Sequence, residues 1–431
     1  MSIEDRLTSS IKDAVEQAPL PPGDLATATT RGHRLRRRRR MAVVGGSSAL
    51  VAAIALTAAL VTGGTDRTDR TTPVAPDPSP APGPGSWTRA ADSPLSARYG
   101  PLMVGVGSRV LIMGGHSSEP CPPGADCAIP DDALTDAAVY DVATDTWSVV
   151  AAPPARFART RAVVADEVVV FGTDGDWITY DPAANTWGHL PAPAVATNGP
   201  EAALDGRIYA RESQTPTRDV LVLDVATRTW SRVPTDPLTP RLTDNSLFAT
   251  DAGVVLAGVN YDEAAPDEPT LTQADLWDGA TWTRLPRTGQ IGPFYHWTGN
   301  RLIGLERGTA DGGQTNGWDR AYPYGGALDP TTGTWSPVPG LPTDYGPRND
   351  SWSVDAADGP LVTTSGLVYD DRSQTMTDLG RPDSPVDIEL TGAWADGRLV
   401  VFGGSDEDAR AAGAASLSDE TWVWTPGSAS N

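Results

Sequence analysis

Residues 140–147 read Tyr-Asp-Val-Ala-Thr-Asp-Thr-Trp, and this stretch recurs along the chain. Full-length copies occupy residues 180–187, 223–230, 328–335 and 369–376, the last ending in Met, and a shortened copy occupies residues 277–282. In each copy an apolar residue ends one strand, an Asp can bond its own backbone, and an aromatic residue or Met opens the next strand. The pattern therefore predicts six β-hairpins.

A second element, a short apolar run, recurs upstream of the hairpins. Seven such runs begin at Arg109, Glu167, Arg207, Gly253, Arg301, Pro360 and Arg398. Runs of four or five apolar residues suit strands that are covered on both faces. Glycines follow several of them, most fully as Gly114-Gly115 and Gly403-Gly404, where the backbone can take paths that a Cβ would block.

The strand ending in Gly-Gly, the downstream Tyr-Asp and the Trp seven positions later together resemble kelch repeats, the blades of a β-propeller shared with the galactose oxidase central domain. The resemblance covers about residues 86–426 and implies an all-β, kelch-type propeller of seven blades. The last repeat ends at Trp422-Val423-Trp424 and lacks an outer strand, which Ser86-Trp87-Thr88 would supply. An open β-sandwich, the alternative, does not explain the regular spacing.

The run Met41–Val61 carries no charged residue and, at about 1.5 Å per residue, reaches roughly the 30 Å of a bilayer core. Arg34 and Arg36–Arg40 precede it, and basic residues beside an apolar span stay in the cytoplasm. We therefore expect residues 41–62 to form a transmembrane signal-anchor, with the propeller outside the cell. A cleaved signal peptide or a buried core helix is the alternative.

The segments beside this span are also readable. Residues 1–40 include an apolar stripe at every fourth position, from Ile3 to Val15, which predicts a short amphipathic helix. That helix either docks a cytoplasmic partner or is marginal in solution. Residues 63–85 are Pro-rich and predict an extended linker, and residues 427–431 form a short tail.

Charge divides the chain. The formal net charge is −22, but residues 1–40 hold nine Lys or Arg against five Asp or Glu, so the remainder has 24 against 50. Such an acidic outer part repels phosphate backbones, which argues against nucleic acid as a partner. It is compatible with cations, basic proteins or neutral sugars.

Two cysteines, Cys121 and Cys127, share one loop outside the predicted membrane span, where oxidation favours a disulfide. Asp126, Asp131 and Asp132 lie close by and could join a calcium site, although acidic loops are usually only solvated. Galactose oxidase itself needs a copper site built from Tyr and His side chains. His116, His189 and His296 are far apart in sequence, so we expect no metal and no cofactor.

In a propeller, ligands bind at the mouth of the central channel, where the chain begins each innermost strand. The polar residues expected there, one per blade, are Arg98, Arg159, Glu201, Asp244, His296, Asp350 and Glu389. A ring of mixed charge could hold a sugar or a peptide, although ordinary connecting loops have the same composition. The segment Tyr295-His296-Trp297 suits a saccharide ring, or it simply fills the channel.

Two classes of function remain. The first is a membrane-anchored extracytoplasmic module that recognises a protein or a glycan, and we favour it over catalysis. The second is a carbohydrate-active enzyme of galactose-oxidase-like or epimerase-like type, which would require acid and base residues clustered at one channel mouth. We expect no nucleic acid partner, and contact with membrane lipid only through the helix at 41–62.

Overall fold

The computed structural model describes most of the chain from residue 85 onward. The described ranges are 85–121, 132–151, 153–154, 161–172, 177–213, 219–234, 242–260, 271–287, 295–305, 326–339, 354–364, 366–387 and 389–427, without the side chains of residues 243 and 244. The predicted cytoplasmic segment, the predicted membrane helix and nearly all of the linker lie outside these ranges. Within them, no helix has the length and apolar character that crossing a membrane requires.

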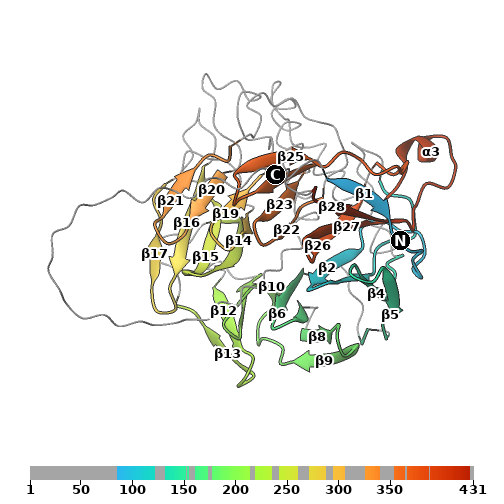
Figure 1. Ribbon diagram of the computed structural model, residues 1–431. Helices are drawn as coiled ribbons and strands as arrows, with labels where there is room; N and C mark the ends of the chain where they lie inside the picture. The colour runs from blue at the N-terminus through green and yellow to red at the C-terminus, as the bar shows by residue number, and fades with distance from the viewer. Residues whose placement is uncertain are drawn as a thin grey trace, which may run out of the picture. The chain divides into compact units, whose positions relative to one another are not determined.

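The described residues form a seven-bladed β-propeller, as the repeats predict, in which every blade is a four-stranded antiparallel sheet (Figure 1). Blade 1 contains β2 (Leu102–Val106), β3 (Arg109–Met113), β4 (Ala137–Asp141) and β5 (Thr146–Val149). Blade 2 contains β6 (Arg161–Ala165), β7 (Val168–Gly172), β8 (Trp177–Asp181) and β9 (Thr186–Leu190). Blade 3 contains β10 (Thr197–Leu204), β11 (Arg207–Glu212), β12 (Val220–Asp224) and β13 (Thr229–Arg232).

The remaining blades repeat this order. Blade 4 contains β14 (Thr243–Thr250), β15 (Gly253–Val259), β16 (Thr272–Trp277) and β17 (Trp282–Arg284). Blade 5 contains β18 (His296–Trp297), β19 (Leu302–Gly304), β20 (Gly326–Asp329) and β21 (Thr334–Ser336). Blade 6 contains β22 (Ala356–Asp358), β23 (Leu361–Thr364), β24 (Leu367–Asp370) and β25 (Thr375–Asp378). Blade 7 contains β26 (Thr391–Ala395), β27 (Arg398–Phe402), β28 (Thr421–Thr425) and β1 (Ser86–Arg89).

The seven apolar runs of the sequence form the second strand of each blade, from β3 to β27. Both of their faces are covered because each blade packs against two neighbours. Seven separate hydrophobic clusters fill the seven junctions between blades, and each draws its residues mainly from two adjacent sheets. The core is therefore a set of interfaces between sheets rather than a single centre.

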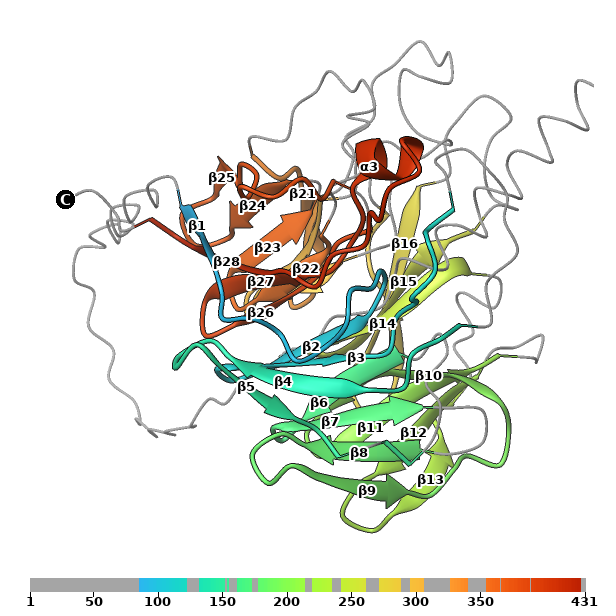
Figure 2. The ribbon, with the colours of Figure 1, turned by 90° about the vertical axis from the view of Figure 1, so that its right-hand side faces the viewer.

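The two ends of the ring are joined as predicted. Strand β1 pairs antiparallel with β28, with Trp87 opposite Trp424, and completes the fourth position of blade 7. Figure 2 shows β1, from the start of the described chain, beside β28 from its end. The closure leaves no open seam between the first and last blades, which removes the sheet edges that would invite aggregation there.

The hairpin turns use the chemistry that the repeat predicts. Asp141 accepts a hydrogen bond from the backbone N–H of Ala143 at 3.0 Å, and Asp181 accepts one from Ala183 at 2.8 Å. Each turn then needs a left-handed residue, such as Asn185 with a φ of 52°. The Tyr180 hydroxyl donates to the Asn185 side chain at 3.0 Å, so the Tyr of the repeat holds the strained position of its own turn.

The repeated Trp has a role that extends beyond its own blade. In six blades the indole N–H of the outer-strand Trp donates to a backbone carbonyl just after the outer strand of the preceding blade. The pairs are Trp147 with Ala91, Trp187 with Ala151, Trp230 with Pro191, Trp282 with Pro234, Trp335 with Pro286 and Trp87 with Leu379. We call this contact the tryptophan latch. It ties each outer strand to the neighbouring blade.

Candidate functional site

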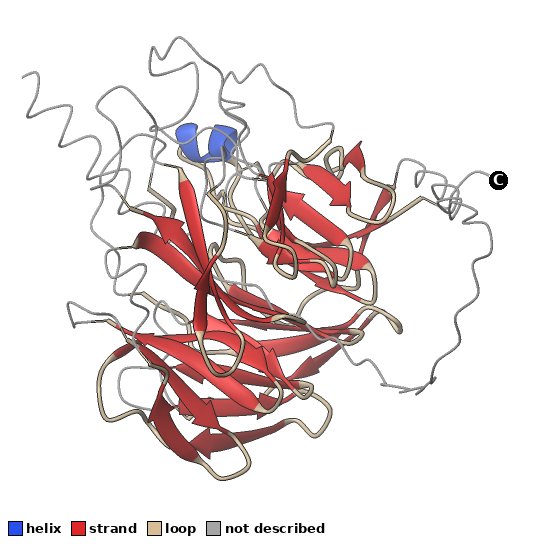
Figure 3. Ribbon diagram, turned by 90° about the vertical axis from the view of Figure 1, so that its left-hand side faces the viewer, coloured by secondary structure: helices blue, strands red, loops and turns tan. Residues whose placement is uncertain are grey.

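Strand order divides the ring into two faces. Short turns join the first strand of a blade to the second, and the third to the fourth, on one face. The loops between second and third strands, and the connections between blades, lie on the other, which we call the loop face. It includes α3 (Glu407–Ala411), a short helix between β27 and β28 in sequence, which Figure 3 shows in blue beyond the ends of the strands. Innermost strands begin on the loop face, so the predicted site residues belong there.

Two innermost strands break the regularity of the propeller. The pairing of β10 with β11 shifts register between Thr197 and Pro200 and again between Pro200 and Ala202, and that of β14 with β15 shifts between Thr243 and Ser246. These are the two strand pairs with register shifts in the described part of the chain, and they lie in adjacent blades. The shift between Pro200 and Ala202 places Glu201, one of the predicted site residues, as the extra residue of a bulge. Bulges often re-aim a side chain beside a functional site.

Glu201 is the centre of a buried ion-pair network. Its side chain has no exposed surface, and it accepts hydrogen bonds from Nε and Nη2 of Arg211 at 2.8 and 2.9 Å. Arg161, the first residue of β6, reaches the same carboxylate from the neighbouring blade at 3.3 Å. The backbone N–H of Leu247 in β14 donates to it at 3.3 Å from the opposite side. One carboxylate therefore joins the innermost strands of blades 2, 3 and 4.

The second bulge takes part in the same network. Arg211 donates from Nη2 to the backbone carbonyl of Asn245 at 2.6 Å. The Oδ1 atom of Asn245 is buried and has no hydrogen-bond partner among the described residues. The Arg161 side chain is 33% exposed, so part of it reaches solvent. We call Arg161, Glu201, Arg211 and Asn245 the bulge site.

The sequence placed Arg98 among the residues that could contact a ligand. In the structure its side chain is fully buried. Its guanidinium donates to both carboxylate oxygens of Asp136, at 2.7 and 2.9 Å, and to the Gly114 carbonyl at 2.9 Å. The hydrogen bonds from Arg98 hold the pKa of Asp136 below its ordinary value. Arg98 thus fastens the base of the β3–β4 loop.

His296 and Trp297 lie at the junctions of blade 5. Trp297 is 6% exposed and belongs to the apolar cluster between blades 4 and 5, and Tyr295 packs edge-to-face on Phe248 and on Trp335. These rings fill the junction between blades 4 and 5, which agrees with the alternative that the segment fills space inside the ring. His296 is also buried, and its Nε2 atom lies 2.6 Å from a carboxylate oxygen of Asp355 in the segment leading to blade 6.

A further polar group lies where blade 7 meets blade 1. The Tyr99 ring stacks on His116 with centroids 5.2 Å apart, and His116 Nδ1 lies 2.9 Å from Asp132. Burial tends to raise the pKa of Asp132, but hydrogen bonds from His116 and Ser118 outweigh burial and lower this pKa to about 2. Desolvation by the surrounding protein raises the pKa of Glu389, which lies on the loop face with a φ of 56°.

Tyr99 connects these two carboxyl groups. Burial raises the pKa of the Tyr99 phenol, and the negative charges of Asp132 and Glu389 add to this effect, against a hydrogen bond with Ser118. The charges of both carboxyl groups therefore act on the same hydroxyl. The sequence singled out Glu389 but gave no reason to join it with Tyr99, since the two are nearly 300 residues apart.

The other predicted positions are only partly visible. Arg159, Asp350 and Cys127 lie outside the described residues, as do Asp126 and Asp131, and Asp244 is described only in its backbone. Cys121 is disulfide-bonded. Within the described part of the chain, no three His, Cys, Asp or Glu residues are grouped closely enough to hold a metal ion.

Comparison with known proteins returns no family: no family model matches this chain, and no curated protein matches its sequence.

Proposed function

We propose that this protein is a membrane-anchored extracytoplasmic module that binds a protein or glycan ligand on its loop face, at the bulge site. One observation carries the proposal. The two innermost strands with irregular pairing lie in adjacent blades, and Arg211, ion-paired with buried Glu201, connects them by a hydrogen bond to the Asn245 carbonyl. Bulges and buried charges are both costly, and a ring with regular blades needs neither.

The chemistry of the bulge site fits recognition. Glu201 is saturated by Arg211, Arg161 and a backbone N–H, so its carboxylate positions the two guanidinium groups. Arg161 remains partly exposed and can donate to a ligand while Glu201 holds its other end. Such a preorganised donor suits a hydroxyl, a carbonyl or a carboxylate on a sugar or a peptide.

The sequence supports the remaining parts of the proposal. The uncharged run Met41–Val61 behind an Arg cluster favours a single-pass anchor, and the Pro-rich residues 63–85 favour a spacer. The likeness of Gly114-Gly115, Tyr140-Asp141 and Trp147 to kelch repeats favours the kelch type of propeller. These features together would hold the loop face away from the bilayer.

A second function, acid–base catalysis on a carbohydrate, is favoured by the group around Tyr99. Two carboxyl groups in this part of the structure have pKa values shifted in opposite directions. The pKa of Glu389 is raised and that of Asp132 is lowered. In carbohydrate-active enzymes a carboxyl group with a raised pKa can donate a proton while a second carboxylate stays ionised. In this alternative, Glu389→Gln would abolish turnover of a glycoside substrate while Arg161→Gln would not.

A glycan array probed with the purified full-length protein in detergent micelles tests the first proposal, with pull-down from envelope extracts for protein ligands. Arg161→Gln should weaken capture of the bound ligand at least about tenfold, the loss expected for one charge-assisted hydrogen bond. Arg109→Gln is the matched control, because Arg109 lies on the turn face and pairs with Asp141 at 3.6 Å. Equal capture by all three proteins would refute binding at the bulge site.

A further inference from the structure

The junction between blades 5 and 6 lacks the tryptophan latch. Met376 occupies the repeat position in β25 that Trp fills in the other blades, and a thioether cannot donate a hydrogen bond to the end of blade 5. The latch distances at the other six junctions lie between 2.7 and 3.0 Å. The loss of this bond is thus confined to one junction of the ring.

Blade 6 departs from the repeat at a second position, which faces the same junction. The residue after the turn Asp is Val142, Pro182, Val225, Gly279 or Pro330 in the other copies, but it is Asp371 in blade 6. The Asp371 side chain is 2% exposed and forms an ion pair with Arg301 of blade 5. A charged contact at the turn face thus accompanies the missing latch.

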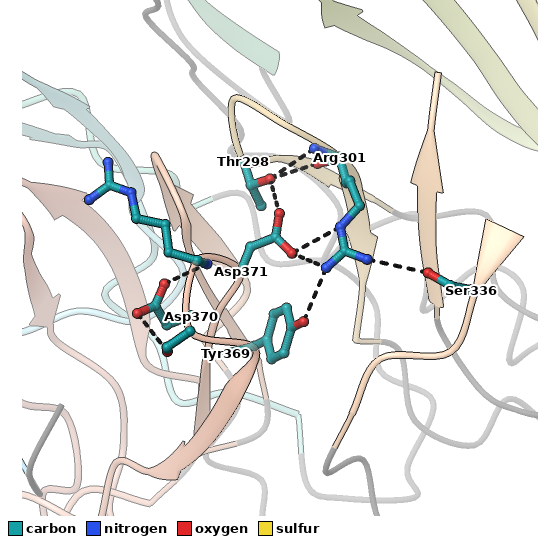
Figure 4. Close-up of polar contacts among 8 residues, drawn as sticks. Thr298, Arg301, Ser336, Tyr369, Asp370 and Asp371 are labelled. Carbon is teal, nitrogen blue, oxygen red and sulfur yellow. Dashed lines mark hydrogen bonds and ion pairs between the residues drawn. The ribbon is translucent and has the colours of Figure 1, made fainter. Parts of the chain in front are cut away.

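Figure 4 shows how Asp371 is held. One carboxylate oxygen accepts from Arg301, through Nε at 3.1 Å and also through Nη2, and the other accepts from the Thr298 hydroxyl at 2.7 Å. Arg301 also donates to the Tyr369 hydroxyl and to Ser336, each at 3.3 Å. Burial tends to lower the pKa of Arg301, but Asp371 and Tyr369 outweigh burial and raise this pKa above its ordinary value.

The innermost strands on the two sides of this junction are also short. Strand β18 has two residues and β22 has three, whereas the innermost strands of the other blades have five or eight. At the loop face the two blades meet through His296 and Asp355. Polar pairs therefore fasten this junction at both faces, with fewer ladder residues between them.

Separating an apolar junction exposes its whole surface to water, whereas the two ions of a buried pair recover their hydration when the blades separate, so a junction fastened by charge costs less to open. The joint between the chain ends is better secured. There β1 pairs with β28 over four positions, and the latches of Trp87 and Trp147 hold it on both sides. We propose that the ring opens between blades 5 and 6, and not where its two ends meet. The ion pair of Arg301 and Asp371 holds this junction closed.

Hydrogen exchange measured by mass spectrometry on the full chain in detergent micelles tests this proposal. In the native protein, peptides covering β18, β19, β22 and β23 should exchange faster than those covering β1, β26 and β28. Arg301→Gln should raise exchange at the junction of blades 5 and 6 by about tenfold, because it removes the ion pair and leaves Asp371 buried without its cation. Arg109→Gln, at the corresponding position of blade 1, should leave exchange at the junction of blades 5 and 6 unchanged.

A second variant tests the proposal by gain rather than loss. Met376→Trp restores the latch donor and should slow exchange in β18 and β22 several-fold without changing β1 or β28. The proposal is overturned if β1 and β28 exchange first in the native protein. It is also overturned if Arg301→Gln speeds exchange equally in all blades, or if Met376→Trp has no local effect.

Discussion

The tryptophan latch can be tested by replacing Trp230 with Phe. The Trp230 indole N–H donates to the Pro191 carbonyl at 2.7 Å, and its ring meets Trp177 edge-to-face with centroids 4.9 Å apart. Phe keeps an aromatic ring against Trp177 but has no N–H. The change thus removes the hydrogen bond between blades 3 and 2 and leaves most of the aromatic contact.

The expected loss follows from these contacts. A hydrogen bond of this kind contributes about 0.5–1.5 kcal/mol, because water competes for both partners in the unfolded chain. Weaker packing of the smaller ring adds a few tenths, so the free energy of unfolding should fall by about 1–2 kcal/mol. For a folded unit of more than 300 residues, that is a fall in Tm of roughly 1–3 °C. Trp230→Ala also removes the ring and should cost about 3–5 kcal/mol.

Differential scanning calorimetry of the full-length protein in mild detergent measures these shifts without relying on Trp fluorescence. Met376→Phe is the matched control, since its position carries no latch and has no hydrogen bond to lose. Its Tm should stay close to that of the native protein. A Trp230→Phe variant as stable as the native protein, or a Met376→Phe variant that loses as much, would show that packing alone joins the outer strands.

Three further predictions concern the site, acid stability and the membrane. Glu201→Gln leaves Arg211 buried without its anion and should destabilise the fold by about 3–5 kcal/mol in urea denaturation. An equal loss in Asp141→Asn, which breaks the partly exposed pair with Arg109, would contradict this. The pKa of Asp132 is lowered from 3.8 to about 2, so its stabilising contribution is present above the unfolded value and is lost as pH falls toward the folded one. The drop in Tm between about pH 5 and pH 2 should therefore be smaller in Asp132→Asn than in the native protein, and an equal drop in both would refute this role. Deletion of residues 41–62 should move the protein from the membrane fraction to the soluble fraction, and its continued sedimentation with membranes would contradict the proposed anchor.

Several features of the ring could be predicted because their causes are local in sequence. The Asp of each hairpin bonds an amide two or three residues later, so turn chemistry is visible in a window of eight residues. Apolar runs of constant spacing predict the second strands, and the count of these runs equals the number of blades. The missing outer strand of the last repeat pointed to β1, since an unpaired sheet edge is unfavourable.

The site depended on contacts that no local pattern contains. Arg161, Glu201, Arg211 and Asn245 come from four strands of three blades, and the two bulges that bring them together follow from how those blades meet. Trp297 and Arg98 appeared available in the sequence and are buried in the structure, because neighbouring blades and loops cover them. The sequence by itself determined the repeated strands, the turns and the closure of the ring, since each follows from backbone hydrogen bonding within or beside one repeat. Only the tertiary structure decided which polar side chains meet, because that depends on the packing of sheets whose residues are far apart in the chain.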